Sequence, residues 1–377
     1  MTAELAGRRS RALIISDVTG PGGVGTHIGQ LALEGRKLGW NVSVLMDDGR
    51  SSDVMAGSLR QLGVSLMRRS LYHGFHTEDA IRRAVWNTFD EYRPDIVHVQ
   101  CGSPRSAIVP RELALEACLP LIITENFVPA ELDVTEEKLR RLRQIYQRAF
   151  AAIAVCDENL RLLRERFGLY ASRQLVIRYG VELPPDVRPR GTAPQLFKAV
   201  TVARLTPRKG IDVLIRAVAV LTDEVRSQFV FTVVGDGEQR GQLQELAEDL
   251  RVAGCIKFVG WSDDVRSLLR AQDLFILPSL AEGQPIALLE ALAAELPCIA
   301  SAVSGIPEVL GEGEYGALVN PNDPAALSAA VSAFARDPKL LQRKSSAARP
   351  HLRLNHDPKT NTAKVIALWH DTISSPR

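Results

Sequence analysis

Short apolar runs alternate with longer amphipathic runs along this chain, and the alternation occurs in two successive series. In the first series, strand-length apolar runs cover residues 12–16, 41–46, 95–100, 121–124, 152–155 and 175–178, with helical runs over 26–38, 78–92 and 135–150. In the second series, strand-length runs cover residues 198–203, 230–234, 256–259, 273–277, 298–300 and 317–319, with helical runs over 210–221, 238–250, 265–271, 285–295 and 325–335. Parallel strands need a long crossover connection, which is usually a helix. The pattern therefore predicts two doubly wound α/β domains with parallel sheets.

A proline-rich stretch separates the two series. Residues 183–194 contain four prolines and one glycine, a composition typical of a linker between domains. We therefore place a first domain at residues 1–185 and a second at 195–357. An apolar stripe in residues 361–370 predicts a terminal helix, and the segment 358–377 is a candidate for packing back on the first domain.

Composition and charge exclude several classes of protein. The formal net charge is only +2 and the basic residues are interleaved with acidic ones, which argues against nucleic acid as a partner. The five cysteines are odd in number, scattered and without metal-ligand spacing, as expected for reduced residues of a cytoplasmic protein. No secretory leader opens the sequence and no apolar run reaches membrane-spanning length, so we expect no integral membrane segment.

Residues 279–290 join the end of a predicted strand, a Gly/Pro turn, a helix start and two carboxylates. Pro285 is expected as the first helical residue, where its missing N–H has no consequence. Glu282 lies in the turn and Glu290 lies more than one helical turn along. Both can face the crevice beyond the carboxyl end of the strand, which is where open α/β sheets bind ligands.

Two cations follow the first strand of the second series. Arg204 and Lys209 flank the loop after residues 198–203, at the same predicted sheet edge as the two glutamates. A guanidinium and an ammonium together can neutralise a diphosphate, although two loop cations can also be merely solvated. Glycine-rich loops at residues 20–25, 235–237 and 304–307 could receive anionic oxygens on their backbone N–H groups, and each alone could equally be a turn.

Taken together, these motifs resemble those of the retaining glycosyltransferases of family 4, which have the GT-B fold. The resemblance spans almost the whole chain and rests on the pair Glu282 and Glu290, separated by seven residues, and on the Arg204 to Lys209 loop. Further matches are Val234-Gly-Asp-Gly237, Gly305-Ile-Pro-Glu308 and the Gly22-Gly23-Val24 loop. The resemblance implies two Rossmann-like domains that face each other across a cleft, the first binding the acceptor and the second the nucleotide-sugar donor.

The resemblance also implies a role for each matched residue. Arg204 and Lys209 would bind the donor diphosphate and stabilise its departure, while Glu282 would bind hydroxyls of the donor sugar. Glu290 would accept hydrogen bonds from the ribose, a task that suits an ionised carboxylate. The remaining donor-binding residues would be Gly22, Gly23, Gln284, Pro285, Ile286, Gly305 and Ile306. Trp261 is a candidate for contact with the nucleobase, or a core or surface tryptophan.

The implied reaction moves a hexose-type sugar from a nucleoside-diphosphate sugar to an acceptor hydroxyl with retained anomeric configuration. UDP-sugar is favoured as the donor and GDP-sugar is the second choice. We expect no metal and no cofactor, because Arg204 and Lys209 supply the positive charge and no matching Asp-x-Asp motif is present. The acceptor could be a small molecule, a glycan or a lipid. The lack of a basic amphipathic helix favours a soluble one.

The first domain departs from the pattern of the family. Where many members carry a histidine after a strand, this chain has Glu125 and Asn126, and these become candidates for the acceptor side. Gln100 ends another predicted strand and could face the cleft. His98, on the same strand, is either a catalytic candidate or a core histidine whose hydrogen bonds are satisfied.

Two other classes of function compete with sugar transfer. A nicotinamide-dependent dehydrogenase would use Gly20-x-Gly22-x-x-Gly25 for the dinucleotide and Asp47 or Asp48 for the ribose. That alternative leaves the two cations and two glutamates of the second domain unexplained. A GT-B epimerase, or a nucleotide-sugar-binding protein without catalytic activity, would keep the donor residues and alter the acceptor side.

Overall fold

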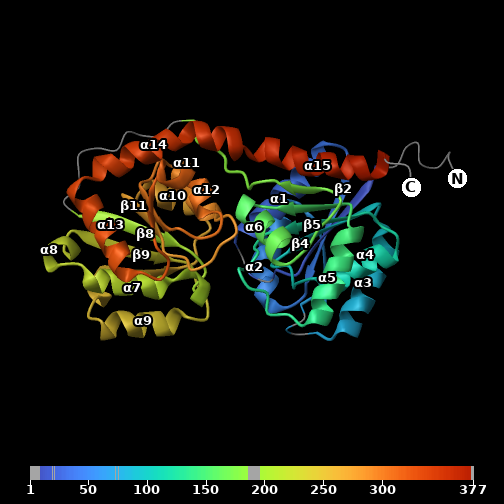
Figure 1. Cartoon of the computed structure of the whole chain (residues 1–377), viewed down its shortest axis with the longest axis horizontal. Coiled ribbons are helices and arrows are strands. Elements are labelled where there is room, and N and C mark those ends of the chain that lie inside the picture. The colour runs from blue at the N-terminus through green and yellow to red at the C-terminus, as the bar shows by residue number, and fades with distance from the viewer. Residues whose placement is uncertain are drawn as a thin grey trace. The chain divides into compact units, whose positions relative to one another are not determined.

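The computed structural model describes residues 9–18, 20, 22–72, 74, 76–185 and 196–374. The chain divides into two units (Figure 1). Unit 1 comprises Met1–Tyr179 and Pro358–Arg377, and unit 2 comprises Gly180–Asp357. Unit 2 thus begins before the predicted linker, and residues 186–195 of that linker lie outside the described residues.

Unit 1 is a parallel sheet with helices on both faces. Its described strands are β1 (Arg11–Ser16), β2 (Asn41–Asp47), β3 (Ser65–Arg69), β4 (Ile96–Cys101), β5 (Leu121–Glu125), β6 (Ala151–Ala154) and β7 (Gln174–Val176), in the order β3-β2-β1-β4-β5-β6-β7. Its helices are α1 (Gly23–Lys37), α2 (Asp53–Gln61), α3 (Glu78–Tyr92), α4 (Ile108–Glu116), α5 (Glu136–Arg148), α6 (Asp157–Arg161) and the returning α15 (Pro358–Ser374). The strand order reverses between β1 and β4, so the predicted doubly wound architecture is confirmed.

Unit 2 repeats this architecture. Its described strands are β8 (Phe197–Val202), β9 (Phe229–Val234), β10 (Ile256–Gly260), β11 (Leu274–Leu277), β12 (Cys298–Ser301) and β13 (Ala317–Val319), in the order β10-β9-β8-β11-β12-β13. Its helices are α7 (Ile211–Val220), α8 (Asp223–Arg226), α9 (Arg240–Asp249), α10 (Val265–Arg270), α11 (Ile286–Ala293), α12 (Ile306–Val309), α13 (Pro324–Arg336) and α14 (Pro338–Asn355). The switch in strand order lies between β8 and β11.

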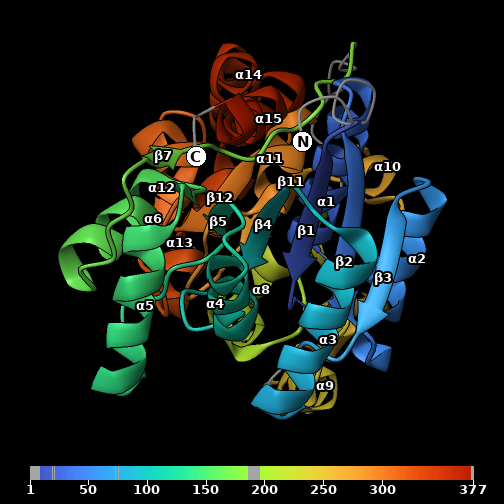
Figure 2. The same cartoon turned by 90° about the vertical axis from the view of Figure 1, so that its right-hand side faces the viewer.

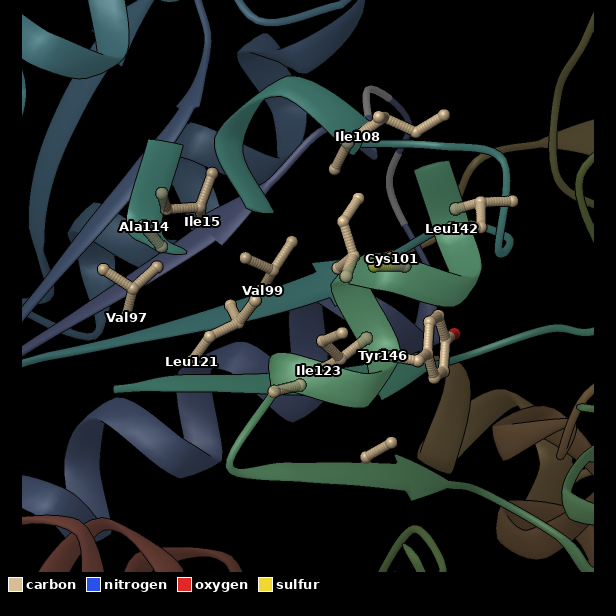
Figure 3. Close-up of a cluster of buried hydrophobic side chains, with 14 of the residues drawn as sticks. Ile15, Val97, Val99, Cys101, Ile108, Ala114, Leu121, Ile123, Leu142 and Tyr146 are labelled. Atoms are coloured by element: carbon tan, nitrogen blue, oxygen red, sulfur yellow. The ribbon is translucent and has the colours of Figure 1, made fainter. Parts of the chain in front are cut away.

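Both faces of the unit 1 sheet are buried. Helices α3, α4 and α5 cover one face (Figure 2), where Val97, Val99 and Ile123 of the sheet belong to one cluster of buried side chains with Leu142 and Tyr146 of α5 (Figure 3). Helices α1, α2 and α15 cover the other face. Strands buried on both faces must be apolar throughout, which is why they appear in the sequence as continuous apolar runs rather than alternating ones.

The returning helix α15 belongs to the core of unit 1. Trp369 is fully buried, lies 5.6 Å from Trp40 between ring centroids, and donates its indole N–H to Nδ1 of His98 at 3.2 Å. Gly35 of α1 makes room for it, because a Cβ there would come within 2.9 Å of the Trp369 ring. No helix within the described ranges combines the length and apolar character needed to cross a bilayer.

Some predicted elements differ from those in the structure. Helix α11 begins at Ile286, and Pro285 precedes it as the N-cap residue with an extended ψ of 111°, so the prediction of Pro285 as the first helical residue was wrong by one position. The sequence pattern also missed α14, which contains Pro350. A proline in a helix interior removes a backbone hydrogen bond and normally ends the helix, so the pattern gave no reason to continue there.

Two glycines of unit 2 allow close contact between loops. Gly235 has a φ of +130°, and a Cβ on it would lie 1.9 Å from the carbonyl oxygen of Ala203. Gly237 is similarly close to Leu205, since its Cβ would lie 2.4 Å from that carbonyl oxygen. Close packing of the loops after β8 and β9 therefore explains these glycines, which the sequence had offered as an anion-binding loop.

We expect Gly235→Ala to lower the free energy of unfolding by about 2–4 kcal/mol, because it combines a strained backbone conformation with a clash. Urea denaturation would measure this loss. Gly241→Ala is the matched control, since Gly241 lies in α9 and a Cβ on it meets nothing within 4 Å. This control should be neutral or stabilising by up to about 1 kcal/mol. Equal stabilities of the two variants would contradict the packing explanation.

Candidate functional site

The carboxyl edge of the unit 2 sheet brings three loops together. The loops follow β8, β11 and β12, which are neighbours in the sheet. Gly210, with a φ of +62°, allows the first two loops to touch, because a Cβ there would lie 2.1 Å from the carbonyl oxygen of Pro278. The N–H of Leu280 also donates to the carbonyl oxygen of Arg208 at 2.8 Å. The switch point between β8 and β11 thus holds the predicted cations beside Glu282.

Glu282 is the centre of this cluster. Its carboxylate is buried and contacts three side chains of the two loops. Lys209 forms an ion pair with Oε1, the Ser279 hydroxyl donates to the same oxygen at 2.8 Å, and Arg208 lies 3.4 Å from Oε2. Burial acts to raise the pKa of Glu282, but Lys209 and Arg208 outweigh it and hold the pKa below its usual value. Glu282 is therefore an ionised, buried carboxylate.

The three cations of the cluster differ in their partners. Burial lowers the pKa of Lys209, while the adjacent Glu282 acts to raise it. Arg208 also donates to the carbonyl oxygen of Ala281 at 3.0 Å. Arg204 is exposed, and its guanidinium forms no hydrogen bond or ion pair with any residue that the structure describes. In this arrangement Arg204 is open to an anionic ligand, whereas Lys209 and Arg208 share the single negative charge of Glu282.

The loop after β12 completes the turn around Glu282. The N–H of Glu282 donates to Oγ of Ser304 at 3.3 Å, and the N–H of Gly305 donates to the carbonyl oxygen of Gly283 at 3.1 Å. Helix α12 starts at Ile306 directly after these contacts. The predicted residues Gln284, Pro285, Ile286, Gly305 and Ile306 thus lie in the same two connected loops and at the helix starts that follow them.

Glu290 lies apart from the Glu282 cluster. It sits in α11, and among the described residues no hydrogen bond or ion pair joins it to the three cations. Burial raises the pKa of Glu290, and Arg266 of α10 acts in the opposite direction. Glu290 lines a small pocket together with Val181, Glu182, Pro184, Arg266, Arg270, Ala293 and Ala294.

Trp261, the candidate for contact with the nucleobase, is exposed, and its indole N–H donates to Asp263 at 2.9 Å.

In unit 1, Glu125 is enclosed by other side chains. Arg111 lies 3.5 Å from its Oε1, and the Tyr146 hydroxyl donates to the same oxygen. Burial raises the pKa of Glu125 to about 7, although Arg111 and Tyr146 act to lower it. Its neighbour Asn126 donates to the carbonyl oxygen of Cys101 at 2.9 Å and accepts from the Tyr179 hydroxyl. Both acceptor-side candidates therefore already have protein partners.

His98 and Gln100 are core residues. Both are fully buried, because β4 is covered on both faces of the sheet, so the expectation that Gln100 faces a cleft is wrong for this structure. Burial lowers the pKa of His98 to about 3, so the ring is neutral. Its Nδ1 accepts from the Trp369 indole N–H, so the neutral ring carries its proton on Nε2, which lies 2.8 Å from the Thr124 hydroxyl and 3.2 Å from the side-chain amide of Gln100. His98 thus has the satisfied hydrogen bonds of a structural histidine.

The glycine loop at the start of α1 is open. Gly22 is exposed with a φ of +144°, and a Cβ on it would meet nothing within 4 Å. Gly22 precedes the helix as its N-cap residue, and Gly23 is the first helical residue. Glycine is favoured at position 22 by the positive φ, and not by crowding from a neighbouring group. The loop therefore leaves space beside the helix start.

Asp47 does not offer a free carboxylate for a ribose. It accepts hydrogen bonds from the N–H groups of Gly49 at 2.9 Å, Leu71 at 3.0 Å and Tyr72 at 2.8 Å. Asp47, Asp48 and His76 each place a potential metal-ligand atom within 4.8 Å of the others, a grouping that the sequence did not predict. Because the carboxylate of Asp47 already holds two loops, the dehydrogenase alternative is left with the exposed Asp48 of its two predicted ribose-binding acids.

Arg208 and Ser279 are the site residues that sequence reasoning missed. Each lies next to or near a predicted residue in the same loop, Arg208 beside Lys209 and Ser279 three residues before Glu282. Their proximity in sequence was a usable signal. Their contacts with one carboxylate depend on how the two loops meet, which the sequence does not show.

Comparison with known proteins places the chain in a family. A model of the glycosyl transferase 4-like domain matches residues 22–180, and a model of the glycosyl transferases of group 1 matches residues 187–351. The amylovoran biosynthesis glycosyltransferase AmsK of Erwinia amylovora is 32% identical over 203 residues, 51% of this chain and 50% of AmsK. A D-inositol 3-phosphate glycosyltransferase of Streptomyces avermitilis is 34% identical over 249 residues, 60% of this chain and 53% of that protein. The chain thus spans about half the length of the curated relatives it matches.

Solved structures share the fold at low sequence identity. A sucrose-phosphate synthase of Thermosynechococcus elongatus has a TM-score of 0.79 at 18% identity, covering 97% of this chain and 100% of its own. HepE of Anabaena in complex with UDP-glucose has a TM-score of 0.78 at 20% identity, covering 96% of this chain and 99% of its own. The two domain models in tandem and the two doubly wound units agree, and the chain belongs to the family 4 glycosyltransferases of the GT-B fold.

Proposed function

We propose that this chain transfers a hexose-type sugar from a nucleoside-diphosphate sugar to an acceptor hydroxyl, with UDP-sugar as the favoured donor and GDP-sugar as the second choice. The observation that carries the proposal is the ionised Glu282 at the switch point of unit 2, which contacts Lys209 and Arg208 and interacts electrostatically with Arg204. Family membership supports transfer, and a structural neighbour of the same fold was solved with UDP-glucose.

In this proposal the cations hold the diphosphate. Arg204 and Lys209 bind its oxygens and stabilise the negative charge that develops as the glycosidic bond breaks. Glu282 accepts hydrogen bonds from hydroxyls of the sugar, and Glu290 accepts them from the ribose. Since Arg204, Arg208 and Lys209 provide positive charge at one place, we propose that no divalent metal and no other cofactor is needed.

The transfer would retain the anomeric configuration. The bond between the anomeric carbon and the diphosphate oxygen breaks with its electron pair staying on that oxygen. The acceptor oxygen bonds to the same face of the anomeric carbon, and its proton passes to the departing diphosphate. Glu282 is held by Lys209, Arg208 and Ser279, so it is poorly placed to act as the nucleophile of a double displacement. Positioning and charge stabilisation would supply the rate enhancement.

Unit 1 would bind the acceptor, which could be a glycan, a lipid or a small soluble molecule. The names of two relatives refer to amylovoran biosynthesis and to D-inositol 3-phosphate, and the second is a hydroxyl-rich compound. With Glu125 and Asn126 held by protein partners, the open loop at Gly22 and Gly23 is the better candidate for contact with substrate. We place the reaction in the cytoplasm, where nucleotide sugars and reduced cysteines are both expected.

The test is a thermal-shift series with UDP, GDP, ADP and NAD. A ligand at 100 times its Kd stabilises the folded state by about 2.7 kcal/mol, which moves the melting temperature by several degrees in a protein of this size. We expect UDP to give the largest shift, GDP a smaller one and NAD none. A shift with NAD alone would favour the dehydrogenase instead. A shift with UDP but no sugar transfer would favour a binding protein without catalytic activity.

A further inference from the structure

Arg208 contacts the centre of the candidate site, although no matched motif assigns it a role. Its guanidinium Nη1 lies 3.4 Å from Oε2 of Glu282 and donates to the carbonyl oxygen of Ala281 at 3.0 Å. Its own carbonyl oxygen accepts from the N–H of Leu280 at 2.8 Å. Side chain and backbone of Arg208 thus both bind the turn that carries Glu282.

Lys209 cannot serve Glu282 and the diphosphate equally. In the structure its ammonium is paired with Oε1 of Glu282 and is largely buried, with 14% of the side chain exposed. A diphosphate carries more negative charge than one carboxylate, so it competes strongly for the same ammonium. A donor that draws Lys209 away leaves Glu282 buried with one cation fewer, and an unpaired buried charge is costly.

We propose that Arg208 is a positioning residue for sugar transfer, which keeps Glu282 ionised and in place when the donor diphosphate draws Lys209 away from it. The inference rests on the proposed function. Arg208 suits this task because it binds the oxygen of Glu282 that Lys209 does not. The planar guanidinium can contact Ala281 and Glu282 at once, whereas a lysine would supply only the charge.

Among the residues that the structure describes, the charged groups found to act on Glu282 come from the loop after β8. They are Lys209 and Arg208, in contact with the carboxylate, and Arg204, which interacts with it electrostatically. Ser279 contributes only a neutral hydroxyl. With Lys209 engaged by phosphate, the contacting cation is Arg208. Removing Arg208 should therefore raise the pKa of Glu282 in the donor complex, and activity should need a higher pH.

The experiment measures donor cleavage with water as the acceptor, because the natural acceptor is unidentified. Release of nucleoside diphosphate from UDP-glucose, UDP-galactose and GDP-mannose is compared, and the donor cleaved fastest is used for kcat and KM from about pH 3.5 to 9, a range that includes the acid limb set by a carboxylate with a lowered pKa. The variants are Arg208→Gln, Arg208→Lys and the control Arg216→Gln. Arg216 is exposed on α7, and its side chain has no hydrogen bond or ion pair among the described residues. Melting temperatures show that each variant is folded.

We expect Arg208→Gln to lower kcat about ten- to a hundredfold near neutral pH and to move the acid limb of the kcat profile up by about one pH unit. Arg208→Lys should restore the position of the acid limb, and Arg216→Gln should match the wild type. An active wild type whose acid limb is unchanged in Arg208→Gln overturns this inference alone. A folded wild type that cleaves none of the donors overturns the proposed function and this inference with it.

Discussion

Lys209→Ala is expected to lower kcat/KM for sugar transfer by about 10²- to 10³-fold, the loss typical of removing one preorganised charge from a developing anion. The ammonium is held in the loop between β8 and α7, close to the switch point of the sheet. At an exposed position, water would supply much of the stabilisation that a removed cation had given to the leaving diphosphate. At a largely buried position no such replacement is available, so the leaving diphosphate departs with less stabilisation.

The variant should remain folded, because Glu282 keeps Arg208 and Ser279 as partners. The matched control is Lys198→Ala, since Lys198 is an exposed residue of β8 in the same unit. Steady-state kinetics with the preferred donor and melting curves with and without UDP would measure the effects. The melting shift caused by UDP should shrink in Lys209→Ala and persist in the control. Turnover within about threefold of the wild type would remove Lys209 from the donor site.

Much of the fold of unit 2, and the meeting of Lys209 with Glu282 at one sheet edge, were predictable from the sequence. The strands there are continuous apolar runs, and Arg204, Lys209 and Glu282 follow two of them directly. Parallel strands carry their following loops to one sheet edge, so residues just after different strands are brought together whatever the details of packing. The prediction succeeded because it used only the order of strand and loop.

Contacts between distant segments could not be predicted in this way. His98 was left open between catalyst and core residue, and its role is decided by Trp369, which lies 271 positions further along the chain. Glu125 stood at the place of a family histidine, yet the side chains of Arg111 and Tyr146 enclose it. These partners come from helices whose faces the sequence pattern does not orient. The position of these residues at or near strand ends was therefore not enough to predict whether their side chains are exposed to an acceptor.

The second large effect is expected for Glu282→Gln, which should weaken sugar transfer but strengthen the binding of UDP. Glu282→Gln keeps the shape of the side chain and removes its charge. Sugar transfer should fall by about 10²-fold or more, because the amide offers one acceptor oxygen where the carboxylate offers two. UDP should nevertheless bind about tenfold more tightly, since Lys209 and Arg208 would no longer be neutralised by the carboxylate.

The opposite effects on transfer and on UDP binding follow from the ion pairs that Glu282 forms. Without donor, the negative charge of Glu282 competes with the diphosphate for two of the three cations that lie beside it. Isothermal titration of UDP into the wild type, Glu282→Gln and the control Glu245→Gln would measure the affinities. Glu245 is exposed on α9, and its side chain has no hydrogen bond or ion pair among the described residues. Weaker binding of UDP by Glu282→Gln would mean that the carboxylate organises the cations for the diphosphate rather than competing with it.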